Sequence, residues 1–241
     1  MTIPLKEFKI VFIINLFSSL LIYLTKDYFI FPYFLQIVLI VLASTTFYLL
    51  YKQTNLKIAI SIYLLVGLYG LFIETLSIKT GFPYSSFEYS DLMGYKIADI
   101  VPYTVFLVWP TLVISSYSIS GQITSKKINK IMVTTILLLL LDLVFDPVAT
   151  KLGFWFWDNS GLYYGVPFLN FVGWIFSGLI SSLIVFILIG ERMLNNRYFG
   201  LIYLGNLLLW TYLSIKFFMF LPVIISVLIF TILIKKYRLV K

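Results

Sequence analysis

The sequence predicts an all-α protein, a polytopic transmembrane helical bundle that forms a single integral-membrane domain over residues 1–241. Of the 241 residues, 61% are hydrophobic and 12% are charged, and the mean hydropathy is +1.01. A soluble domain has about 25% charged residues. Apolar runs of helical length recur along the whole chain, and the basic residues gather between alternate pairs of runs.

Eight apolar runs are long enough to cross a membrane at about 1.5 Å per residue, and we expect one helix from each. The runs cover residues 8–24, 28–51, 56–78, 100–119, 128–145, 167–190, 198–215 and 217–234. Merging the last two would leave seven helices. That merged helix would be about 55 Å long, too long for one crossing of about 30 Å, so we expect a tight turn at Lys216.

The basic residues divide unequally between the two ends of this arrangement. Thirteen of the 18 Lys and Arg residues share one end: Lys6, Lys9, Lys52, Lys57, Lys126, Lys127, Lys130, Arg192, Arg197, Lys235, Lys236, Arg238 and Lys241. Five share the other end: Lys26, Lys79, Lys96, Lys151 and Lys216. Because basic residues accumulate on the cytoplasmic side, we expect a multi-pass cell-membrane protein with both termini cytoplasmic. Topology therefore accounts for the net charge of +8, and we expect membrane lipids and no nucleic acid as partners.

Neither cysteine nor histidine occurs in the chain. Their absence removes thiol nucleophiles, disulfides and the usual ligands of zinc, di-iron and haem. We expect no metal and no cofactor, which leaves carboxylates as the groups for acid–base chemistry.

Three carboxylates lie where apolar runs end. Asp142 and Asp146 are four residues apart and share one helix face. Pro147 disfavours helical geometry at Asp146, so we expect that helix to end there. Glu74 is expected about one turn inside the end of its own helix. The three acids should therefore meet at one membrane level.

Asp142 follows six apolar residues, 136–141, where an ionised carboxylate costs roughly 2.5–3.5 kcal/mol. A neutral acid in such a place can donate a proton to a carbon–carbon double bond. The structural alternative is a hydrogen bond that joins two helices. Since acids inside a membrane are functional by default, we expect Glu74, Asp142 and Asp146 to be catalytic.

Aromatic residues and one amide cluster around these acids. Because ring faces stabilise a developing cation, this clustering favours carbocation chemistry on a hydrophobic substrate. An interfacial aromatic belt is the alternative. We expect the substrate to be bound by Phe82, Tyr84, Tyr89, Trp109, Trp155, Trp157, Tyr163, Tyr164, Asn170 and Trp174.

Two spacings occur twice in the chain. Gly81-Phe82 begins seven residues after Glu74, and Gly153-Phe154 begins seven residues after Asp146. Trp109 and Trp174 each follow a Val-Pro pair, seven residues after the proline. This pattern indicates an internal duplication that relates helices 3–4 to helices 5–6, with the site between the copies. Chance in a chain rich in Phe and Gly is the alternative.

The second acid segment resembles the carotenoid biosynthesis membrane protein family, which includes bisanhydrobacterioruberin hydratase and the CruF carotenoid 1,2-hydratases. The residues that match are Asp142, Asp146, Pro147, Val148, Trp155, Trp157, Tyr163, Tyr164, Gly165, Val166, Pro167, Asn170, Phe171, Gly173 and Trp174. The first segment is similar in Glu74, Thr80, Gly81, Pro83, Tyr89, Val101, Pro102 and Trp109. Ser85 and Phe87 depart from the family pattern, which has glycine and tyrosine there.

The resemblance implies an enzyme that adds water to the terminal 1,2 double bond of an acyclic carotenoid through acid-initiated carbocation chemistry. It implies an acyclic carotenoid substrate within the bilayer and association with other carotenoid enzymes. Two alternatives stay open: a carotenoid cyclase, in which an internal alkene captures the cation, and a non-catalytic carotenoid- or lipid-binding protein.

The charge distribution predicts the side of each connection. Reporter fusions after Lys151 and at the C-terminus should report opposite sides of the membrane, because residues 79–99 and 146–166 are expected opposite the cytoplasm. Reporters on the same side would contradict the eight-helix topology.

Overall fold

The structure is a computed structural model that describes residues 4–25, 31–190, 192, 194 and 196–237. This part of the chain forms eight α-helices, which confirms the all-α prediction. They are α1 (Leu5–Thr25), α2 (Phe31–Gln53), α3 (Leu56–Thr80), α4 (Thr104–Ile123), α5 (Lys127–Leu152), α6 (Phe168–Ile189), α7 (Arg197–Lys216) and α8 (Phe220–Tyr237). Seven of them are long and apolar enough to cross a membrane, and α8 has a shorter apolar stretch, Phe220–Lys235. The protein is thus a multi-pass membrane protein.

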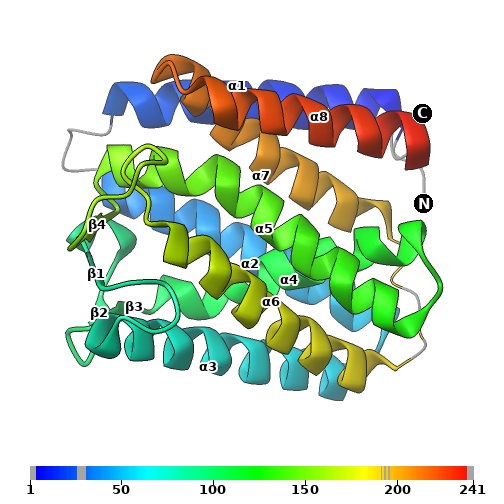
Figure 1. Cartoon of the computed structure of the whole chain (residues 1–241). Coiled ribbons are helices and arrows are strands. Elements are labelled where there is room, and N and C mark those ends of the chain that lie inside the picture. Colours follow the sequence, from blue (N-terminus) through cyan, green and yellow to red (C-terminus); the bar gives the residue numbers. More distant parts are fainter. Residues whose placement is uncertain (1–3, 26–30, 191, 193, 195, 238–241) are drawn as a thin grey trace.

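Successive helices run in opposite directions through the bundle (Figure 1). The start of α1 and the end of α8 lie at one end, and the short strands lie at the other. α7 ends at Lys216 and α8 begins at Phe220, so the expected turn is present. Of the basic residues used for topology, Lys26, Arg238 and Lys241 lie outside the described residues, as does the start of the expected 28–51 run.

Helix α4 lies at the centre of the bundle. It packs against α2, α3, α5 and α7, and 78% of its most apolar window is buried. Its C-terminal half carries small hydroxyl residues that let neighbouring helices approach closely. These are the buried Ser115, Ser116, Ser118 and Ser120.

Helix α5 continues through Pro147 to Leu152, so the expectation that it ends at Asp146 is wrong. A proline in a helix removes the N–H that would bond the carbonyl four residues earlier, here that of Leu143. The Tyr163 hydroxyl donates to this carbonyl at 2.9 Å instead. The backbone oxygen is therefore satisfied by a distant side chain, as the interior of a membrane requires.

The acid-bearing helices α3 and α5 end alike. Glu74 lies six residues before the last residue of α3 (Thr80), deeper than the single turn expected, and Asp146 lies six residues before the last residue of α5 (Leu152). Each helix is capped by a left-handed glycine, with φ of 78° at Gly81 and 73° at Gly153. These matching ends agree with the proposed duplication.

The connections after α3 and α5 pair with each other. Strand β1 (Phe87–Tyr89) runs antiparallel to β4 (Trp155–Trp157), with Phe87 opposite Trp157 and Tyr89 opposite Trp155. The first connection also holds a short 3₁₀ helix, η1 (Asp91–Met93), and a second small sheet, β2 (Lys96–Ile97) with β3 (Val101–Pro102). The pairing of β1 with β4 brings the aromatic residues of the two connections over the same end of the helices.

Gly70 of α3 leaves the space that the Trp109 side chain occupies, so a larger residue at position 70 should destabilise the protein. A Cβ atom at Gly70 would lie 2.5 Å from the Trp109 indole, whereas at Gly121 the nearest atom is Lys130 Cε at 3.9 Å. Gly70→Ala should therefore cost about 1–3 kcal/mol through overpacking and lower the thermal midpoint in detergent by several degrees. Gly121→Ala is the matched control and should not lower it. Equal midpoints for the two variants would contradict this account of Gly70.

Candidate functional site

A cavity lies between the helices at the end of the bundle that carries β1 and β4, and it holds about 920 Å³ of empty space, its open mouth included. Four polar side chains line it: Glu74, Asp146, Asn170 and Asn206. Most of the rest of the wall is aromatic, as is usual for pockets that bind small apolar molecules. The rings belong to Tyr84, Phe87, Tyr89, Trp109, Phe145, Phe154, Trp155, Trp157, Trp174 and Trp210.

Both oxygens of the Glu74 carboxyl group accept hydrogen bonds. The Tyr89 hydroxyl of β1 donates to Oε2, and the Trp109 indole N–H of α4 donates to Oε1 at 2.7 Å. The Glu74 side chain is buried in α3. Two donors aimed at one carboxyl group favour its ionised form. Both oxygens of Glu74 are therefore held by donors in the cavity wall.

The Tyr89 phenol is held in its donating form. Burial, and then the negative charge of Glu74, raise the pKa of Tyr89 well above its ordinary value. The same two causes, in the same order, raise the pKa of Tyr84 on the neighbouring wall. The Tyr89 hydroxyl therefore stays protonated and continues to donate its hydrogen bond to Glu74.

Asp142 and Asp146 share a single donor. The Asn170 amide nitrogen donates to Asp146 Oδ2 at 2.7 Å and to Asp142 Oδ2 at 3.1 Å. Asp142 is fully buried, and its Oδ1 has no donor among the described residues. Two buried carboxylates this close repel each other when both are charged. The arrangement therefore favours a proton held by the pair, and Asp146 is the member that faces the cavity.

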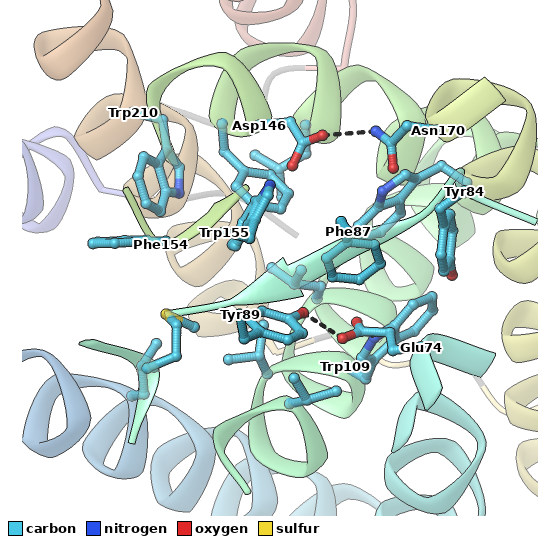
Figure 2. A pocket seen from close by; sticks show the side chains of 18 of the residues that line it. Glu74, Tyr84, Phe87, Tyr89, Trp109, Asp146, Phe154, Trp155, Asn170 and Trp210 are labelled. Atoms are coloured by element: carbon cyan, nitrogen blue, oxygen red, sulfur yellow. Dashed lines mark hydrogen bonds between the residues drawn. The ribbon is translucent and has the colours of Figure 1, made fainter. Parts of the chain in front are cut away.

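The rings form a continuous wall between these two acid sites. Trp109 and Trp174 stack with centroids 5.1 Å apart and planes 6° from parallel. Across the β1–β4 pairing, Tyr89 packs edge-on against Trp155, and Phe87 packs against Trp157. Figure 2 shows Glu74 and Asp146 in different parts of this wall, each with its hydrogen-bond partner.

The structure brings together most of the residues expected from the sequence. Nine of them line the cavity: Glu74, Tyr84, Tyr89, Trp109, Asp146, Trp155, Trp157, Asn170 and Trp174. Asp142 lies behind Asp146 and Asn170.

Besides Asp142, three expected residues do not line the cavity. Phe82 is 54% exposed and packs edge-on against Phe176. The Tyr163 hydroxyl bonds the Leu143 carbonyl, and the Tyr164 hydroxyl accepts the N–H of Leu221 at the start of α8. Both tyrosines thus bond backbone groups of the bundle.

Several lining residues were missed in the sequence. Phe145 and Phe154 lie beside expected residues, and Phe87 was noted only as a departure from the family pattern. Asn206 and Trp210 of α7 are four residues apart and so share one face of the helix, and this spacing was a usable signal. Leu35 and Leu39 of α2 also line the cavity, but nothing separates them from the other apolar residues of their helix.

The described residues contain no group of three or more acidic side chains placed to hold a metal ion. What the site offers is one carboxyl group with a donor on each oxygen, one carboxyl pair that shares a donor, and a surrounding set of rings. This arrangement can donate a proton to a hydrophobic molecule and stabilise the cation that results.

The fold and the site together define a multi-pass membrane protein with an acid-bearing aromatic cavity. The sequence profile of the family described as carotenoid biosynthesis protein matches residues 33–233, and the chain belongs to this family. The resemblance noted in the sequence is thereby confirmed.

One curated relative is the bisanhydrobacterioruberin hydratase of Haloarcula japonica. The two chains are 31% identical over 121 residues, which is 48% of this chain and 41% of the relative. The match thus spans less than half of that protein's length. No solved structure shows a significant match to this chain.

Proposed function

We propose that this protein adds water to the terminal 1,2 double bond of an acyclic carotenoid. One observation carries the proposal: two acid sites of opposite character face one aromatic cavity. Glu74 has a donor on each oxygen, whereas Asp146 shares its donor with Asp142. Carboxyl groups whose surroundings favour opposite protonation states are the usual mark of an acid and a stabilising anion. Family membership and the hydratase relative support the same reaction class.

The first step is protonation of the alkene. Asp146 carries the proton of the carboxyl pair and gives it to the less substituted alkene carbon. The π electrons form the new C–H bond, and the carboxyl O–H bond breaks. A tertiary cation remains on the other carbon, and the Asn170 amide stabilises the Asp146 carboxylate that is left.

The cation is stabilised by rings and by fixed charge. The stacked pair of Trp109 and Trp174 offers ring faces, which attract a cation within about 6 Å of the ring centroid. Glu74 adds a negative charge that needs no reorganisation, because Tyr89 and Trp109 already orient it.

The second step is capture by water. A lone pair of the water oxygen forms the C–O bond, and the Asp146 carboxylate takes the released proton. The carboxyl pair then holds its proton again, so one turnover consumes one water molecule and changes no oxidation state. Glu74 is a poorer base here, because both of its oxygens already accept hydrogen bonds.

We further propose that the chain is one integral domain of the cell membrane with both termini on the cytoplasmic side. The cavity then lies near the opposite surface, among membrane lipids that supply the acyclic carotenoid. Other carotenoid enzymes are the expected neighbours, since they produce this substrate and use its product.

Pigment mass tests the reaction. The protein should be co-expressed with enzymes that make lycopene, and separately with enzymes that make a longer acyclic carotenoid. Hydration adds the mass of one water molecule at each end that reacts. A product of unchanged mass but altered retention would show a cyclase, and unaltered pigment in both strains would contradict an enzymatic role.

The acids are predicted to act in one site. At least two of the variants Glu74→Gln, Asp142→Asn and Asp146→Asn should lower the initial hydration rate in membranes by about 10²-fold, the scale of lost acid–base catalysis. Glu88→Gln is the matched control, because Glu88 lies between Phe87 and Tyr89 in β1 but is exposed. Gel filtration in detergent checks that each variant is folded. Wild-type rates in all three acid variants would return these residues to a structural role.

A further inference from the structure

The indole N–H of Trp155 has no acceptor among the described residues, although only 7% of the side chain is exposed. Buried polar groups are nearly always hydrogen-bonded, so a lone buried donor calls for a partner that the protein does not supply. Two other indoles of the wall have one. Trp109 donates to Glu74, and Trp157 donates to Thr150 Oγ1 at 3.2 Å. Trp155 thus differs from both in the bonding of its N–H group.

Trp155 is held rigidly between the two acid sites. In the β1–β4 pairing it lies opposite Tyr89, the residue that donates to Glu74. Its ring packs edge-on against Tyr89 at 5.7 Å and against Phe145 at 5.8 Å between centroids. Phe145 directly precedes Asp146 in α5, and Trp155 and Asp146 line the same cavity. In Figure 2 the Trp155 nitrogen lies on the side of its ring that is toward Asp146.

We propose that the Trp155 N–H positions the water molecule that adds to the cation, an inference that rests on the proposed hydration. The N–H donates to one lone pair of the water oxygen, and the other lone pair attacks the cationic carbon. Asp146 accepts the proton of this water, so two fixed groups hold it at the point of attack. An indole N–H only donates, so Trp155 is a positioning residue and takes no part in proton transfer.

This role has a consequence that a packing role lacks. The tertiary cation has two fates: water captures it, or it loses a proton and becomes an alkene again. In D₂O the second fate leaves deuterium in unhydrated carotenoid. Loss of the positioning group should slow capture and leave protonation intact, so the ratio of hydrated to deuterated unhydrated product should fall.

Trp155→Phe tests this, because it keeps an aromatic ring and removes the donor. Membranes that contain each variant are incubated with acyclic carotenoid in D₂O, and both products are measured by mass spectrometry. The ratio should fall by about tenfold to a hundredfold, the scale of a misplaced reactant, while the summed products change little. Trp157→Phe removes an N–H that Thr150 already accepts, so it should keep the wild-type ratio even where it changes the total rate.

A second variant covers the case in which Trp155→Phe fails to fold. Replacing Trp155 with 3-benzothienylalanine exchanges the N–H for sulfur and preserves both rings. A lowered ratio with this residue supports the proposal. A wild-type ratio in either donor-free variant overturns the proposal. A parallel loss of hydration and deuterium uptake also overturns it, because that result would place the Trp155 ring in the protonation step. Wild-type protein that neither hydrates nor exchanges would overturn the proposed function instead.

Discussion

Three carboxyl groups inside an apolar helical bundle must find their hydrogen-bond donors within the protein, and much of the structure around the cavity follows from this constraint. A buried charge without partners costs several kcal/mol. The pairing of β1 with β4 helps to place Tyr89 beside Glu74. Gly70 has no side chain, which leaves Trp109 room to reach the same carboxyl group. Helix α6 places Asn170 against the two aspartates. Several of the residues that line the cavity are therefore in place because they donate hydrogen bonds to these buried acids.

The two halves of the proposed duplication surround their acids differently, and this difference underlies the roles that we propose for them. Position 70 lies four residues before Glu74, as Asp142 lies four residues before Asp146. In the first half this place is a glycine, and the Trp109 indole fills the space and donates to the acid. In the second half a second acid occupies the place, and one amide serves both carboxyl groups. Corresponding positions thus yield a carboxyl group with two donors on one side and two carboxyl groups that share one donor on the other.

The sequence was sufficient where local pattern decides structure. Hydropathy located eight helices, the turn at Lys216 followed from length, and nine of the thirteen expected site residues line one cavity. It was insufficient where a distant partner decides. Pro147 remains inside α5 because Tyr163, sixteen residues further along, bonds the Leu143 carbonyl, and no local rule contains that bond. Asn206 and Trp210 reach the cavity because α7 packs against α4 and α5, contacts that hydropathy does not encode.

The choice between hydration and cyclisation depends on which nucleophile lies next to the cation. A cyclase must keep water away from a long-lived cation until an internal alkene reaches it, so its wall should offer water no fixed donor. Here the Trp155 N–H, which has no acceptor in the part of the chain that the structure describes, lines the same cavity as Asp146, and Asn206 adds a second polar group from α7. A buried donor in an otherwise aromatic wall is costly unless an oxygen occupies it, and water is the smallest molecule that does so. The polar groups of the wall therefore favour capture by water, even though the rings alone would serve either reaction.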